Sequence, residues 1–258
     1  MARKGARTRK GQPLPPPLPP ETRTVGQLVA ETLNLYRRRF WHSLALGAAP
    51  AAAGVLLAEL PLELRLAAAF TVAAAAASAS YAFASAFVAG SKPTLERILP
   101  ATAIGVVALG PAVLVLAFLG LAGLLLAVVW LGFFGFVVPV AVVENQLSPR
   151  RAAELARADM VHTLGSLATL ALVGLLTAYV VFFTLRSAGT AALQASAFVS
   201  VLLISPILFL GAALLYFDQA ARVPTRRSDA DLHHALEPDR PGRADAEGES
   251  RTAARGKP

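Results

Sequence analysis

Glu144 and Asp218 are the residues of this sequence best placed to do chemistry, because each is a carboxylate at the end of a long apolar run. Tyr216 lies two residues before Asp218, and a basic segment with Arg151 and Arg157 follows Glu144. A carboxylate at the edge of an apolar layer is expected to bind an arginine, and such a pair is usually structural. We therefore predict an ion pair from Glu144 to Arg157 or Arg151, with contact to a polar ligand as the alternative.

Other reactive arrangements are absent from the sequence. The apolar runs have no ionisable residue in their interior, which argues against a proton-coupled pump or a voltage sensor and leaves open a passive pore. The chain has no cysteine, and its four histidines lack the spacing of metal ligands. His42 and His162 are expected where apolar runs meet lipid headgroups. Because nucleophile-elbow, Walker and dinucleotide-binding motifs are also missing, we expect a non-enzyme with no cofactor and no metal site.

The composition is that of a membrane protein. Of the 258 residues, 55% are hydrophobic and 16% are charged, whereas a typical soluble domain has about 25% charged residues. No charged residue occurs between residues 66 and 90 or between residues 98 and 143. A bilayer core needs about 20 apolar residues per helix, so the second run predicts a hairpin of two helices. We place its turn at the sequence GLAG, residues 120–123, because glycine loosens a helix.

The predicted fold is an all-α, polytopic membrane helix bundle of about six transmembrane helices with short cytoplasmic amphipathic helices. The spans are expected at residues 43–60, 66–89, 100–119, 121–143, 164–185 and 190–217. Pro50, Pro139 and Pro206 lie inside three of them. The second span is rich in Ala and Ser, and such small side chains let helices approach closely. We therefore expect the second span in the middle of the bundle.

An amphipathic helix is predicted at residues 25–40, before the first span. Thr24 and Gln27 form a capping box that starts it, and apolar residues recur at helical spacing along one face. Three arginines crowd its end and a tryptophan follows, a pattern that suits a membrane interface. The candidates for contact with lipid are Arg37, Arg38, Arg39 and Trp41. Packing of the apolar face on the bundle is a second, compatible interpretation.

Both ends of the chain are predicted to be disordered outside the bundle. Residues 1–23 are basic and Pro-rich, a composition with too few apolar side chains to form a core. Residues 24–221 form the transmembrane domain. Residues 222–258 form a disordered cytoplasmic tail, in which Asp229 to Leu236 can form a transient helix.

Lys and Arg are distributed unevenly over the predicted loops. Of the 24 basic residues, all except Arg65 and Arg186 fall in the N-terminal segment, the two longer connections and the tail. Basic residues favour the cytoplasmic side, so both termini are predicted in the cytoplasm. The abundance of Ala, Arg and Pro is typical of a GC-rich bacterial genome and indicates a bacterial plasma membrane.

The charge of the chain indicates its partners. A net charge of +8 and a pI of about 10.6 are also typical of proteins that bind nucleic acid. Because the basic residues flank apolar spans, anionic lipid headgroups are the expected partner instead, and no nucleic acid is expected. A membrane or cytoplasmic protein is a second candidate partner.

Three segments together resemble a known bacterial family. They are TVGQLVAETLNLYRRRFW at residues 24–41, VVPVAVVENQLSPRRAAELARADMVHTLG at 137–165 and LLYFDQAARVP at 214–224. Over residues 24–224 the chain is similar to the six-span membrane-domain proteins of the glycerophosphoryl diester phosphodiesterase family and to related uncharacterised membrane proteins. The residues that match the motifs are Tyr36, Arg37, Arg38, Phe40, Glu144, Arg157, Tyr216, Asp218 and Arg222.

The sequence departs from the family pattern at two places. A basic residue often follows the aspartate sooner than it does here, where residues 219–221 are Gln-Ala-Ala, and Ala158 stands where the family often has serine. Some members carry the phosphodiesterase activity in a separate domain, for which this chain has no room. The resemblance therefore implies a membrane bundle without a catalytic domain.

Three functions fit the sequence. The first is a non-catalytic scaffold or accessory subunit with a lipid-contacting basic cytoplasmic face. The second is a component of a transporter or permease for a small or amphiphilic solute, and the third is an enzyme that acts on lipid headgroups. A polar cavity converging on Glu144, Arg157 and Asp218 would favour the second or third function, whereas a bundle packed by Ala and Leu would favour the first.

Overall fold

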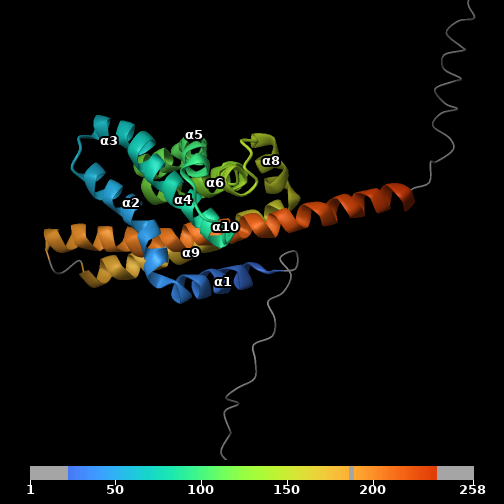
Figure 1. Cartoon of the computed structure of the whole chain (residues 1–258). Coiled ribbons are helices and arrows are strands. Elements are labelled where there is room, and N and C mark those ends of the chain that lie inside the picture. The colour runs from blue at the N-terminus through green and yellow to red at the C-terminus, as the bar shows by residue number, and fades with distance from the viewer. Residues whose placement is uncertain (1–22, 186–188, 237–258) are drawn as a thin grey trace, which may run out of the picture.

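The computed structural model describes residues 23–185 and 189–236, and every regular element in these two ranges is helical (Figure 1). The helices are α1 (Val25–Arg38), α2 (Phe40–Ala58), α3 (Leu62–Ala68), α4 (Ala74–Val88), α5 (Leu95–Leu119), α6 (Leu124–Phe134), α7 (Val137–Val143), α8 (Pro149–Ala158), α9 (Met160–Leu185) and α10 (Thr190–Leu236). A π-helical turn, η2 (Ala69–Ala73), joins α3 to α4, and a 3-10 turn, η3 (Gly120–Gly123), joins α5 to α6. The predicted all-α fold is confirmed.

Five continuous segments in the described ranges are long and apolar enough to cross a membrane. The third, Leu95–Val143, has 49 residues, and a straight helix of that length would span about 70 Å, more than twice a bilayer core. It folds back at Gly120, whose φ of 55° a residue with a Cβ rarely adopts. Trp130 of α6 then donates its indole N–H to the Ala108 carbonyl of α5 at 2.7 Å. The predicted hairpin is therefore present, and these segments form six membrane-length arms.

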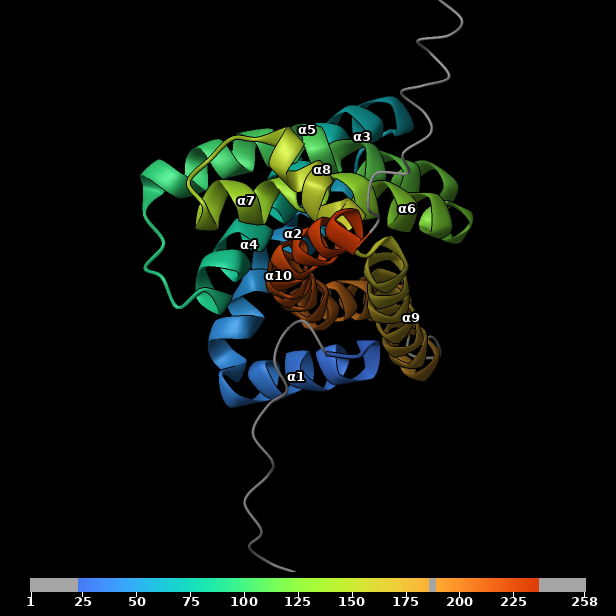
Figure 2. The ribbon, with the colours of Figure 1, turned by 90° about the vertical axis from the view of Figure 1, so that its right-hand side faces the viewer.

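The amphipathic helix α1 lies against α9 and α10 (Figures 1 and 2). Thr24 and Gln27 form the predicted capping box, in which the Thr24 backbone N–H donates to Gln27 Oε1 at 2.8 Å. Leu28 and Thr32 are fully buried on the inner face of the helix. Arg39, with φ −128° and ψ 47°, breaks the helix just before α2 begins. The apolar face of α1 thus packs on the bundle.

Helix α4 lies in the middle of the bundle, where it contacts α2, α5, α7 and α10. Its buried residues are Ala and Ser, apart from Tyr81. A Cβ added to Gly105 of α5 would lie only 2.7 Å from the Cβ of Ser78 in α4. Small side chains therefore bring the two backbones together, as the Ala- and Ser-rich sequence of this span predicted.

Helix α10 is longer than the sequence predicted. The disordered tail was expected to start at Arg222, but the helix continues to Leu236, through the segment expected to be only transiently helical. No glycine occurs between Gly211 and Leu236, so the chain has no glycine cap that would end the helix at Arg222. The remainder of the predicted tail, and residues 1–22 of the predicted N-terminal segment, lie outside the described residues.

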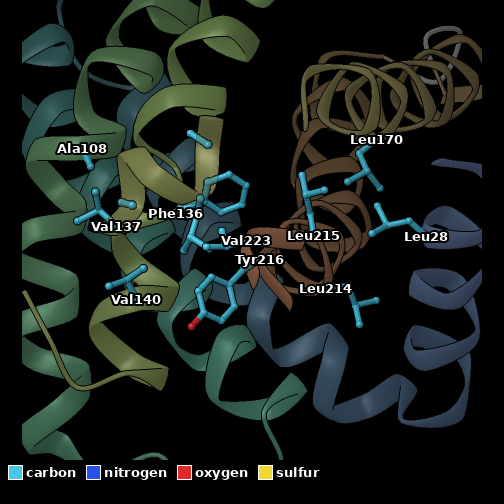
Figure 3. Packing of buried hydrophobic residues seen from close by; sticks show 13 residues of the cluster. Leu28, Ala108, Phe136, Val137, Val140, Leu170, Leu214, Leu215, Tyr216 and Val223 are labelled. Carbon is cyan, nitrogen blue, oxygen red and sulfur yellow. The ribbon is translucent and has the colours of Figure 1, made fainter. Parts of the chain in front are cut away.

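Two apolar clusters form the core. One joins α1, α5, α7, α8, α9 and α10 around Phe136 and Tyr216 (Figure 3). The other joins α4, α5, α7 and α10 around Tyr81. Because α5, α7 and α10 contribute to both clusters, they connect the two parts of the core. Glu144 directly follows the last residue of α7. Asp218 lies on the part of α10 that contributes to the first cluster.

Candidate functional site

The fully buried carboxylate of Asp218 is the centre of a charged network on α10. Arg23, the residue before the α1 cap, donates from Nη1 to Asp218 Oδ1 at 2.7 Å, and only 9% of its side chain is exposed. The second terminal nitrogen of Arg23, Nη2, lies 3.1 Å from Glu31 Oε2 on α1. A buried charge without a partner is very costly. The pair therefore holds the start of α1 against a helix 195 residues further along the chain.

Asp159 connects the start of α9 to α10. Its backbone is not helical, with φ −149° and ψ 88°, and its Oδ1 accepts from the His162 backbone N–H at 2.9 Å, which caps α9. Its Oδ2 accepts from Arg222 Nη1 at 2.6 Å, and its backbone N–H donates to Gln219 Oε1 at 3.1 Å. Arg222 also donates to the carbonyl of Arg23 at 3.0 Å. We call the group Arg23, Glu31, Asp159, His162, Asp218, Gln219 and Arg222 the Asp218 network.

Part of the hydrogen-bonding capacity of the Asp218 network is unused. His162 Nε2 lies 3.8 Å from Asp218 Oδ2. These two atoms, the Gln219 amide nitrogen and Arg222 Nε are buried, and none of the four has a hydrogen-bond partner among the described residues. The network therefore has capacity for a small polar group. Within the same ranges, no three His, Asp or Glu side chains are grouped to hold a metal ion.

Glu144 lies in a second polar cluster. Tyr216 of α10 points toward α7 (Figure 3) and donates its hydroxyl to Glu144 Oε1 at 2.8 Å. Arg151 Nε lies 3.2 Å from both carboxylate oxygens, so of the two arginines that the sequence offered, Arg151 makes the pair. Ser148 positions this arginine by accepting from its backbone N–H at the start of α8. We call Glu144, Arg151, Tyr216 and Glu154, which lies 3.6 Å from Arg151, the Glu144 cluster.

Arg157 and the residues expected to contact lipid lie on the surface. Arg157 is exposed on the last turn of α8. Arg37, Arg38 and Arg39 are exposed where α1 meets α2, and Trp41 is 77% exposed. The guanidinium carbon of Arg39 lies 5.3 Å from the centre of an aromatic ring at the end of α4, which is close enough for a cation–π contact.

Sequence reasoning missed several members of the Asp218 network. Arg23 was assigned to the disordered N-terminal segment, and His162 was assigned to the lipid headgroups. Asp159 and Gln219 were not considered as site residues. A signal for Asp159 was present, because an Asp three residues before His162 and ahead of an apolar run is a helix-capping pattern. The partner of Asp218 had no such local signal.

The bundle also contains an apolar cavity of about 190 Å³ between α4, α5, α6, α9 and α10. We call it the apolar slot. Leu109 and Leu170 are typical of its walls, which consist of aliphatic and aromatic side chains and one glycine. Glu144, Arg157 and Asp218 do not line it. The slot is therefore not the polar cavity that would have favoured transport of a polar solute or chemistry on lipid headgroups.

No family model, no curated protein and no solved structure matches this chain. The resemblance to the membrane-domain proteins of the glycerophosphoryl diester phosphodiesterase family thus rests on three short sequence segments. Four of the residues that it singles out lie in the two polar groups described above: Glu144, Tyr216, Asp218 and Arg222.

Proposed function

We propose that this protein is a non-catalytic membrane scaffold or accessory subunit whose basic face contacts anionic lipid headgroups. The observation that carries the proposal is the pairing of both carboxylates with arginines of the same chain, Asp218 with Arg23 and Glu144 with Arg151. Together with Tyr216, these pairs tie α1, α7, α8 and α10 to one another. Carboxylates that pair with arginines of the same chain hold helices in fixed positions, and a scaffold requires such fixed helices.

A transporter or permease component is the alternative function, and a lipid-headgroup enzyme is the third. A path for a polar solute needs polar groups that face a cavity within the spans. The apolar slot offers aliphatic walls instead. Among the transport functions, the slot therefore favours an amphiphilic solute over a small polar one.

The proposed location is a bacterial plasma membrane, with both ends of the chain in the cytoplasm. The support is the distribution of Lys and Arg, which leaves only Arg65 and Arg186 in the loops on the other side. In this orientation the exposed residues Arg37, Arg38 and Arg39 face the cytoplasmic leaflet. Each basic residue near an anionic surface contributes about 1 kcal/mol to binding.

Lipid contact is tested by measuring thermal unfolding of the full-length protein in nanodiscs of phosphatidylcholine with and without phosphatidylglycerol. The test variant is Arg37→Gln with Arg38→Gln and Arg39→Gln, and the control variant, which removes the same charge from the C-terminal segment, is Arg251→Gln with Arg255→Gln and Lys257→Gln. We expect phosphatidylglycerol to raise the Tm of the wild type and of the control, and salt to reduce this gain. The test variant should lose most of the gain. An equal gain in all three proteins would contradict the proposed lipid contact.

The scaffold role is tested by native mass spectrometry of the protein released gently from its own membrane. We expect a membrane or cytoplasmic protein to remain bound reproducibly and in a fixed ratio. The variant Glu144→Gln separates this proposal from its alternative. A single retained solute, lost when Glu144 is changed, would overturn the scaffold proposal in favour of transport.

A further inference from the structure

The apolar slot is long and narrow. Along α6 its wall follows one face of the helix at spacings of three and four residues: Leu124, Ala127, Val128, Leu131 and, just after the helix, Gly135. From Leu124 to Gly135 a helix rises about 16 Å. A cavity of about 190 Å³ spread over such a length is a slender channel and not a rounded pocket.

The slot exists because small side chains from five helices meet in one place. Ala77 of α4, Ala112 of α5, Ala127 of α6, Ala171 of α9 and Ala212 of α10 all line it. Protein interiors are normally packed as densely as organic crystals, so a void of this size leaves its lining atoms without van der Waals partners. Apolar cavities stay dry and bind apolar molecules instead of water.

The slot reaches the outer surface of the bundle beside the α5–α6 hairpin. Leu116, which lines the slot, is itself 37% exposed. Next to it on α5, Phe118 and Leu119 are 68% and 47% exposed. In a membrane-spanning hairpin, this surface faces lipid hydrocarbon and not water.

We propose that the apolar slot holds one acyl chain of a membrane phospholipid. A hydrocarbon chain matches the slot in three respects: it is long and slender, it carries no polar group that needs a partner, and it is present at high concentration where the slot opens. The proposal does not depend on the scaffold function, because a bound chain is compatible with any of the three functions.

Other occupants fit the slot less well. A helix from a second copy of the chain is about 10 Å wide with its side chains and cannot enter a channel this slender. A polar solute would lose its hydrogen bonds with water and gain none from aliphatic walls. A compact apolar ring would fill only part of the length.

The test is photolabelling in nanodiscs made of phosphatidylethanolamine and phosphatidylglycerol, with a small fraction of a phospholipid that carries a diazirine in the middle of one acyl chain. After illumination, mass spectrometry locates the adducts on α6. We expect adducts at Ala127, Val128 and Leu131, on the slot face, in addition to those at Leu125 and Leu126, which are 76% and 53% exposed on the outer face.

Variants that fill the slot make the test specific. Ala127→Leu with Ala212→Leu should reduce labelling of the slot face several-fold and leave the outer face unchanged. Ala117→Leu, at an exposed position of α5, is the control and should change neither. Adducts confined to the outer face of the wild type, or slot-face labelling that persists in the filled variant, would overturn the proposal.

A second measurement covers the case in which the filled variant folds poorly. Delipidated protein in detergent is unfolded by heat with and without added phosphatidylcholine, which has no net charge and so avoids the anionic-lipid effect proposed for Arg37, Arg38 and Arg39. We expect phospholipid to raise the Tm of the wild type and of Ala117→Leu, and to have little effect on the filled variant, whose leucines already occupy the space. An equal rise in all three proteins would contradict occupation of the slot.

Discussion

At the scale of single residues, Asp218 and Arg23 form a buried ion pair in which each charge neutralises the other. We expect Asp218→Asn to destabilise the protein by up to about 3–5 kcal/mol, since it breaks the buried pair and leaves only the partly exposed Glu31 to balance the Arg23 guanidinium. Thermal unfolding in detergent measures the loss. The double variant with Arg23→Gln should recover part of it, because neither charge is then left alone.

Glu96→Gln, at an exposed position in the first turn of α5, is the matched control for Asp218→Asn and should leave the Tm unchanged. If Asp218→Asn were as stable as this control, the buried pair would not be what fixes α1. Limited proteolysis gives an independent measure, because a released α1 should be cut sooner in the variant.

The Glu144 cluster allows a graded test of whether Glu144 is structural. Tyr216→Phe keeps the buried ring and removes one hydroxyl, so it should cost about 1 kcal/mol. Glu144→Gln also weakens the bonds from Arg151 and should cost more, because bonds to a charged group are stronger. Thermal unfolding of both single variants and of the double variant gives the coupling between them. Unchanged stability of Glu144→Gln together with lost ligand binding would assign Glu144 to ligand contact instead.

Sequence separation decides which of these contacts the sequence alone can predict. Glu144 and Arg151 are seven residues apart across a turn with a recognisable cap, so a contact between them was predictable. Arg23 and Asp218 are 195 residues apart, and neither residue carries a local signal for the other. Helical periodicity specifies which face of an element is apolar, but it does not specify which elements meet.

At the scale of elements, α2 and α10 approach each other closely at Gly47, and a substitution there tests this contact. A Cβ on Gly47 would collide with the backbone carbonyl oxygen of Leu202, whereas a Cβ on Gly54 of the same helix would meet nothing within 4 Å. We therefore expect Gly47→Ala to lower the Tm by forcing the helices apart. Gly54→Ala should leave it unchanged or raise it, since Ala favours a helix over Gly by about 1 kcal/mol. Equal Tm values would contradict this packing.

Helix boundaries were predictable wherever a glycine, proline or cap determined them. The α5–α6 turn lies at the predicted GLAG sequence, and α8 begins at Pro149 after the Ser148 cap. The π-helical turn Ala69–Ala73 carries no such residue, and α10 continues through Pro224 to Leu236 although a proline normally interrupts a helix. The π-helical turn contacts α2, α3, α4 and α5, and propensity does not determine how these neighbours pack.

For the whole molecule, the α5–α6 hairpin determines on which side of the membrane everything after it lies. Two crossings in Leu95–Val143 return the chain to its starting side, whereas a single crossing would invert α8 and every later connection. The contact from Trp130 to Ala108 requires the two arms to lie side by side. With six crossings, the basic residues gather on one side, as the positive-inside rule demands.

The chain has no cysteine, so single cysteines can report this topology without a background. Leu121→Cys lies in the hairpin turn and Leu147→Cys in the connection from α7 to α8, at positions that are 70% and 58% exposed. In intact cells, a membrane-impermeant maleimide should label Leu121→Cys, while Leu147→Cys should be labelled only after lysis. A reporter fused after Pro258 should likewise be active only in the cytoplasm. With the N-terminus in the cytoplasm, labelling of Leu147→Cys from outside would mean that the 49-residue segment crosses once, because an odd number of crossings before Glu144 then places that connection outside.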